Sequence, residues 1–206
     1  MKPEDQIHVT DRPEYRVILL HGYGSTAAEM VQAFSGYTQT LTSPFIGLDA
    51  PFSCDLYKDK LQWFKLSFLG EYLNPQIREQ ANSLVKRIEK INVKASKTVL
   101  LGHSQGAMIA AYIKLFLKQH WKIICISGML PFIHTIKHRM NRKISFIHGE
   151  KDQMIPTSIL YGHLQEARKL GIDILLNVVP GAGHALEKEL CMAAVNELNH
   201  IINKKK

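Results

Sequence analysis

The chain has 206 residues, of which 46% are hydrophobic and 21% are charged, and its formal net charge is +8. This composition is ordinary for a globular protein and excludes a disordered or fibrous chain, while three scattered cysteines exclude a disulfide framework. No apolar run reaches the ~20 residues that span a bilayer, and the polar start lacks the apolar core of a secretory signal, so we expect one cytoplasmic domain over residues 1–206.

The positive charge does not indicate a nucleic-acid partner. Lysine and arginine are spread along the chain, the tight run at 204–206 excepted, and no nucleic-acid motif accompanies them. We expect a solvated basic surface, which leaves open a transient contact with an acidic membrane surface. We also expect a monomer or a weak homodimer.

The first half of the chain alternates between segments of strand length and segments with the helical period. A strand over 15–20 (YRVILL) ends in the turn HGYGS, and a helix over 27–34 follows. A second strand lies within 44–50. The amphipathic pattern of 75–91 then predicts a helix that covers a sheet.

Residues 51–73 show no clear period, and a connection of this length is usually functional or disordered. The segment is rich in aromatic side chains, which argues against disorder. These are Phe52, Tyr57, Trp63, Phe64, Phe68 and Tyr72. We therefore predict that this segment is a substrate-binding loop.

The second half of the chain continues the alternation. Strands are predicted at 99–101, 121–127, 143–149 and 171–179, and helices at 105–117, 157–170 and 186–201. This order predicts an α/β fold with a mostly parallel central sheet, helices on both faces and right-handed crossovers. Because ligands bind at the carboxyl ends of the strands in such sheets, residues directly after a strand are the site candidates.

Residues 102–106 read GHSQG, a G-x-S-x-G pattern between an apolar strand and a nearly all-apolar helix. In this context the serine sits on a sharp, strained turn with its hydroxyl exposed. Gly102 and Gly106 are needed because a Cβ there would collide with the neighbouring helix or strand. The helix N-terminus adds partial positive charge, which suits an oxyanion. The pattern predicts that Ser104 is a nucleophile.

A nucleophilic serine needs a base, and His184 is the candidate among the ten histidines. It lies in the loop PGAGH after the last strand, at the same sheet edge as Ser104. A carboxylate must orient the base, and Asp152 is the preferred residue because it follows a strand at that edge. Glu150 is a near rival that we expect to support its turn, and Asp49 is the third candidate.

The other histidines are given structural interpretations. His21 and His103 stand at strand ends and are expected to shape their own turns. His134 and His138 share helical spacing, but the glutamate of H-E-x-x-H and a third ligand are lacking, so we expect a solvated face and not a metal site.

Two backbone groups are the predicted oxyanion donors. In the α/β-hydrolase arrangement these are the N–H after the nucleophile, here Gln105, and an N–H from the turn after an early strand, here Tyr23. The hypothesis is that His184 takes the proton of Ser104 as its hydroxyl attacks an acyl carbonyl. Water later releases the acid from the acyl-enzyme intermediate.

The segments HGYGS, WF, GHSQGA, SGMLP, GEKDQMIP and PGAGHAL occur in the order and spacing of the phospholipase/carboxylesterase family, which the chain resembles from about Tyr15 to His200. That family includes acyl-protein thioesterases and small bacterial carboxylesterases. The resemblance implies an α/β-hydrolase fold and hydrolysis of carboxylic esters or thioesters in small-molecule or acylated substrates, without metal or organic cofactor. The family's triad falls on Ser104, Asp152 and His184, and its oxyanion donors on Tyr23 and Gln105.

The chain departs from the family on the acyl-binding side. Ser25 and Lys65 stand where the family often has aspartate, and 51–62 lacks the usual glycine. Five apolar side chains are the candidates for an acyl groove, or else close the core beneath a long loop. They are Trp63, Phe64, Phe68, Met129 and Leu130.

The preferred function is therefore a serine carboxylesterase or thioesterase. Within enzymes, a serine peptidase or amidase and a lysophospholipase acting at lipid surfaces stay open. From a different class, a non-catalytic hydrolase-like binding protein with a vestigial site is the alternative.

Overall fold

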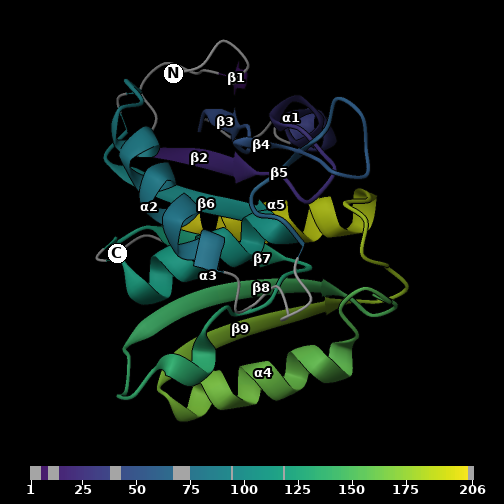
Figure 1. The fold of residues 1–206 in the computed structure, drawn as a ribbon. Helices are drawn as coiled ribbons and strands as arrows, with labels where there is room; N and C mark the ends of the chain where they lie inside the picture. The colour runs from purple at the N-terminus through teal and green to yellow at the C-terminus, as the bar shows by residue number, and fades with distance from the viewer. Residues whose placement is uncertain are drawn as a thin grey trace.

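The computed structural model describes residues 6–8, 14–37, 43–66, 75–93, 95–117 and 119–203. Within these residues a seven-stranded sheet crosses the molecule in the order β1-β3-β2-β6-β7-β8-β9 (Figure 1). The strands are β1 (Gln6–His8), β2 (Tyr15–Leu20), β3 (Phe45–Leu48), β6 (Lys97–His103), β7 (Lys122–Ile126), β8 (Arg142–Gly149) and β9 (Ile172–Val179). All neighbours pair in parallel except β1, which is antiparallel to β3 at the edge.

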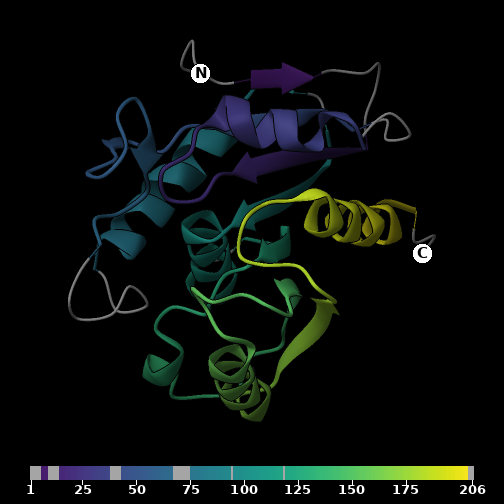
Figure 2. The same ribbon diagram turned by 90° about the vertical axis from the view of Figure 1, so that its right-hand side faces the viewer.

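Helices cover both faces of the sheet (Figures 1 and 2). They are α1 (Ala27–Ser35), α2 (Pro75–Glu89), α3 (Gln105–Phe116), α4 (Thr157–Lys169) and α5 (Lys188–Asn203). The apolar faces of α2, α3 and α4 share one hydrophobic cluster, and those of α1 and α5 share another. The predicted α/β-hydrolase architecture, with a mostly parallel sheet between two helical layers, is confirmed.

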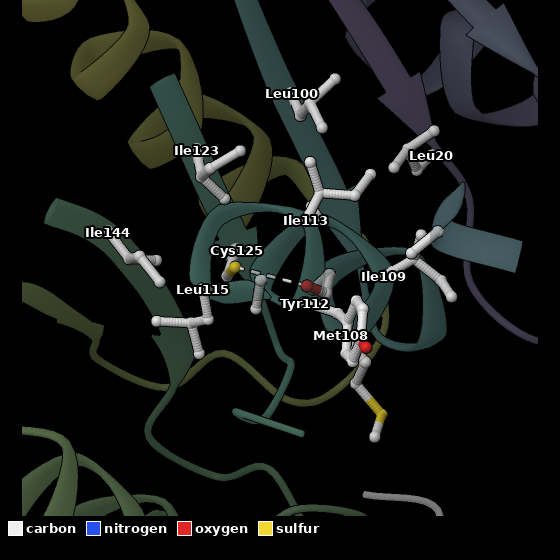
Figure 3. Packing of buried hydrophobic residues seen from close by; sticks show 14 of the residues in the cluster. Leu20, Leu100, Met108, Ile109, Tyr112, Ile113, Leu115, Ile123, Cys125 and Ile144 are labelled. Carbon is white, nitrogen blue, oxygen red and sulfur yellow. Dashed lines mark hydrogen bonds between the residues drawn. The ribbon is translucent and has the colours of Figure 1, made fainter. Parts of the chain in front are cut away.

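The strands alternate their side chains between these two clusters, as a strand buried on both faces must. In β2, Ile18 belongs to the α2–α3–α4 side and Leu19 to the α1–α5 side. Figure 3 shows side chains of α3 and of the neighbouring strands meeting in the first cluster. Cys125 lies there as a small buried core residue, and its thiol donates to the Ala107 carbonyl at 3.5 Å.

Three short strands were not predicted. β1 has three residues, and in residues 51–66 an antiparallel hairpin pairs β4 (Phe52–Ser53) with β5 (Leu61–Gln62). Strands this short carry no period that a sequence pattern can reveal. Of the predicted aromatic loop, residues 67–73, with Phe68 and Tyr72, lie outside the described residues.

The helical spacing of His134 and His138 does not correspond to a shared helix. A single 3₁₀ turn, η2 (Ile133–Thr135), holds His134, and His138 lies beyond it. Over the part of the chain that the structure describes, no group of three or more His, Cys, Asp or Glu side chains could hold a metal ion. None of the helices in that part has both the length and the apolar character needed to cross a membrane.

Candidate active site

Ser104, Asp152 and His184 meet at the carboxyl edge of the sheet, the side to which the arrowheads point in Figure 1. They follow β6, β8 and β9. His184 Nδ1 lies 2.8 Å from Asp152 Oδ2, and His184 Nε2 lies 3.1 Å from Ser104 Oγ. Because a carboxylate only accepts hydrogen bonds, Nδ1 carries the proton and Nε2 is left to accept the one on Oγ. This chain of hydrogen bonds can make the serine hydroxyl nucleophilic.

The backbone at Ser104 is strained, with φ +49° and ψ −114°. A Cβ added to Gly102 would lie 2.4 Å from the Gly106 carbonyl oxygen, and one added to Gly106 would lie 2.2 Å from that of Leu20. Both distances are impossible for real atoms. The two glycines therefore let the turn pack closely against β2 and α3, as the G-x-S-x-G pattern predicted.

Asp152 is held on both carboxylate oxygens. Oδ1 accepts the backbone N–H groups of Met154 and Ile155 at 2.9 and 2.8 Å, and Oδ2 accepts from His184. Burial alone would raise the pKa of this carboxyl, but the hydrogen bonds from His184 and from the Ile155 N–H outweigh it and hold the pKa below its ordinary value. Asp152 is thus ionised at neutral pH.

The rival carboxylates have other partners. Glu150 Oε2 accepts the Gly181 N–H at 2.9 Å and so supports the turn after β9. Asp49 Oδ1 accepts the Ala27 N–H at 2.7 Å, at the start of α1. Neither is hydrogen-bonded to His184.

His21 and His103 fix the backbone around the site. His21 Nε2 accepts the Ala50 N–H at 3.0 Å, which ties the turn after β2 to the end of β3. His103 Nε2 donates to the His184 carbonyl at 2.9 Å. Burial lowers the pKa of His103 to about 4, so this ring is neutral at neutral pH and holds the His184 loop as a plain donor.

Gln105 and Tyr23, whose N–H groups are the predicted oxyanion donors, line the same cavity as Ser104. Gln105 is the first residue of α3, where an N–H has no acceptor within the helix. The turn that contains Tyr23 presses on Ser104, because a Cβ added to Gly22 would lie 3.3 Å from the Ser104 Cβ. Two backbone hydrogen bonds, of 3.0 and 3.1 Å, then join Gly24 and Ser25 to Leu61 of the hairpin.

The Gln105 side chain has a role that the sequence did not reveal. It is 1% exposed, and its Oε1 accepts the Trp63 N–H while its Nε2 donates to the Phe64 carbonyl, both at 3.0 Å. The residue after the serine therefore anchors the segment that follows the hairpin.

A cavity of about 530 Å³ opens beside Ser104. Apart from Ser104, Gln105 and two histidines, the described residues of its walls are apolar or aromatic, and none of them is Lys, Arg, Asp or Glu. Its lining consists of Tyr23, Leu56, Tyr57, Leu66, His103, Ser104, Gln105, Met108, Met129, Met154, Ile155 and His184. Leu56, Tyr57, Leu66 and Met154 are exposed, so the mouth of the cavity is apolar as well.

The candidates for the acyl groove separate into two groups. Met129 lines the cavity. Trp63, Phe64 and Leu130 do not, because all three are buried in the hydrophobic cluster of α2, α3 and α4, where the Trp63 indole N–H donates to the His21 carbonyl at 2.8 Å. The alternative prediction, that these side chains close the core beneath a long loop, describes the position of Trp63, Phe64 and Leu130. Phe68 lies outside the described residues.

Other lining residues were missed. Met108 stands one helical turn after Ser104 on α3, so the 3.6-residue period carried a signal for it. Met154 and Ile155 share the turn of Asp152. Leu56 and Tyr57 reach the cavity through the hairpin, for which the sequence carried no signal.

Comparisons with known proteins show the family and the fold of the chain. A sequence model of the phospholipase/carboxylesterase family matches residues 5–202. The structure is similar to that of esterase PE8, at 24% identity over 96% of this chain and 98% of that one, with a TM-score of 0.81. It is also similar to Zea mays acyl-protein thioesterase 2, at 17% identity, 96% and 98% coverage and a TM-score of 0.79. The Bacillus cereus carboxylesterase is similar at 14% identity over 95% of this chain and 92% of that one, with a TM-score of 0.72.

The family match spans nearly the whole chain, and the similar structures share the fold over nearly their whole length. The chain is a serine hydrolase that belongs to the phospholipase/carboxylesterase family.

Proposed function

We propose that this enzyme hydrolyses carboxylic esters or thioesters through Ser104 as nucleophile, His184 as base and Asp152 as the group that orients the base. The observation that carries the proposal is the hydrogen-bonded chain from Asp152 Oδ2 through His184 to Ser104 Oγ. It ends at an apolar cavity, where an acyl group can lie against the hydroxyl.

In the first half of the reaction, Ser104 Oγ attacks the acyl carbon while His184 Nε2 takes its proton. The carbonyl oxygen becomes an oxyanion, which the N–H groups of Tyr23 and Gln105 stabilise. The tetrahedral intermediate collapses, the proton on Nε2 passes to the departing alcohol or thiol, and the acyl group stays on Oγ.

In the second half, water attacks the acyl carbon and gives a proton to His184 Nε2. The C–Oγ bond breaks, the carboxylic acid leaves, and Oγ recovers the proton. Asp152 stays ionised throughout and stabilises the transient imidazolium.

The cavity wall supports an uncharged acyl group as the bound part of the substrate. Among the residues that the structure describes, no Lys or Arg lines the cavity, so a phosphate-bearing group would find no cationic partner among them. The exposed apolar side chains at the mouth favour a second candidate, a lysophospholipase that acts at a lipid surface. In that case the headgroup would stay outside the cavity.

The test uses a fluorophosphonate probe and matched ester, thioester and amide substrates with the same acyl group. We expect the probe to label the wild type at Ser104 and to leave Ser104→Ala unlabelled. Ser158→Ala, which changes an exposed serine of α4, is the matched control and should label normally.

Turnover of the ester and thioester, with far slower turnover of the amide, agrees with the proposal. Alcohol and thiol leaving groups need less protonation than amines. Labelling of Ser104→Ala, or preference for the amide, would refute the proposal.

A further inference from the structure

A second histidine lies behind the candidate carboxylate. His148 is the penultimate residue of β8 and its side chain is 0% exposed. By strand alternation it lies on the same side of the sheet as Ile144 and Phe146, which belong to the apolar cluster of α2, α3 and α4. A titratable ring at the end of this apolar row needs an explanation.

The hydrogen bonds of His148 define its tautomer. Nε2 lies 2.8 Å from the Ile155 carbonyl oxygen, which can only accept, so Nε2 carries the hydrogen. The same nitrogen lies 3.4 Å from Asp152 Oδ2, the oxygen that accepts from His184 Nδ1. The N–H is thus hydrogen-bonded to the turn that carries Asp152, and the carboxylate oxygen Oδ2 lies beside the same nitrogen.

The other ring nitrogen of His148, Nδ1, is unfavourable for the stability of the fold. Nδ1 is buried and has no hydrogen-bond partner among the described residues. A buried acceptor without a partner lowers stability, and an apolar side chain of similar size would fill the space without that cost. The contribution of Nε2 has to offset it.

We propose that His148 is a positioning residue for the reaction, which holds Asp152 Oδ2 toward His184 through its Nε2–H. The inference rests on the proposed function of Ser104, His184 and Asp152. Oδ1 is already held by the N–H groups of Met154 and Ile155, so His148 secures the turn through the Ile155 carbonyl and places a second N–H dipole beside Oδ2.

The charges around His148 are few. Among the described residues, the titratable groups that face it are Asp152 and His184, and His103 lies beyond, on the His184 carbonyl. Burial lowers the pKa of His148 against the opposing effects of the Ile155 hydrogen bond and the Asp152 charge, so the ring is neutral at neutral pH. It acts on Asp152 as a dipole, not as a charge.

The test compares His148→Leu, His148→Asn and His148→Gln with a p-nitrophenyl ester as substrate. Glutamine can place an amide N–H near the position of Nε2, whereas asparagine reaches only the position of Nδ1 and leucine has no donor. Phe146→Leu, on the same side of β8, is the control for lost core packing. Circular dichroism and thermal unfolding select the folded variants.

We expect the leucine and asparagine variants to lower kcat by about 10- to 100-fold with little change in KM, because a misplaced carboxylate misplaces the base. The acid limb of the kcat/KM profile should move to higher pH, since a carboxylate without its second N–H dipole attracts the proton on the imidazole more strongly. Glutamine should restore both quantities, and Phe146→Leu should move neither.

Folded leucine or asparagine variants with unchanged kcat and acid limb would overturn the inference. The inference would also be overturned if His148→Gln lost as much kcat as His148→Leu and the acid limb did not move. That result would indicate a residue with a purely structural role. Full activity in Ser104→Ala would instead refute the proposed function, and this inference with it.

Discussion

Gln105 Oε1 accepts the backbone N–H of Trp63 at 3.0 Å, across 42 positions of sequence. One fully buried side chain thus joins the start of α3, where a candidate oxyanion donor lies, to the segment after the β4–β5 hairpin. The hairpin in turn holds the turn of the other candidate donor through Leu61. The two sides of the candidate oxyanion site are connected through this segment.

Replacing Gln105 with alanine tests that connection. The Trp63 N–H and the Phe64 carbonyl lose their buried partner, so we expect the free energy of unfolding to fall by about 2–4 kcal/mol. Activity should fall too, although the backbone N–H of residue 105 is retained. Urea unfolding measures the first effect. Gln119→Ala, which removes an exposed amide bonded to Glu89, is the control and should change stability by less than about 0.5 kcal/mol.

Asp152→Asn separates the preferred carboxylate from its rival. The substitution removes the charge that stabilises the imidazolium, and we expect kcat to fall by about 10³- to 10⁴-fold. Glu150→Gln keeps an acceptor for the Gly181 N–H and should stay within about threefold of the wild type. Steady-state kinetics decides between them, and equal losses in both variants would contradict the assignment of Asp152.

Acid should destabilise the fold through the buried histidines. Burial lowers the pKa of His103 to about 4, and it lowers the pKa values of His21 and His148 as well. Each ring binds a proton more readily in the unfolded chain, so stability is complete above the ordinary histidine pKa of about 6.5 and falls as the pH drops toward 4.

His103→Gln checks this pH dependence. Glutamine can still donate to the His184 carbonyl but does not titrate. Between pH 7 and pH 4.5 we expect the variant to lose about 1–2 kcal/mol less than the wild type in urea unfolding. Asp152 contributes to the pH dependence of stability below this pH range. Because its pKa is lowered, its stabilising effect is present above its ordinary range and disappears only at lower pH. Identical pH profiles for variant and wild type would contradict the histidine account.

Met129→Trp tests the cavity as an acyl site. A larger side chain at the wall shortens the space, so the preferred p-nitrophenyl ester should shift to a shorter acyl chain. Each methylene excluded is worth about 1–3 kcal/mol at most, so the change should be graded. Leu130→Met, a conservative change in the core outside the cavity, is the control. A wild-type chain-length profile in Met129→Trp would place the acyl group elsewhere.

Most of the fold could be predicted because its strands are buried on both faces and read as apolar runs, as in β6 and β8. The location of Ser104, Asp152 and His184 followed from one rule, that loops after parallel strands meet at one edge. Chain order then separated His184 from the other histidines.

The rest depends on contacts that no local pattern contains. Trp63 is buried because the segment after the hairpin packs beneath α2 and α3, and Gln105 anchors it from another part of the chain. The contact of His148 with Asp152 requires a turn that folds back onto the strand it leaves. Leu56 and Tyr57 line the cavity because they lie between β4 and β5, and strands of two residues leave no pattern in the sequence.

The role of Ser104 is tested most simply by the kcat/KM of the wild type and of Ser104→Ala on a p-nitrophenyl ester, with both proteins shown to be folded. We expect the wild type to turn over the ester and the variant to lose about 10⁴-fold or more of its kcat/KM. A folded Ser104→Ala with activity close to that of the wild type would contradict this role, because the reaction would then proceed without the hydroxyl on which the whole site converges.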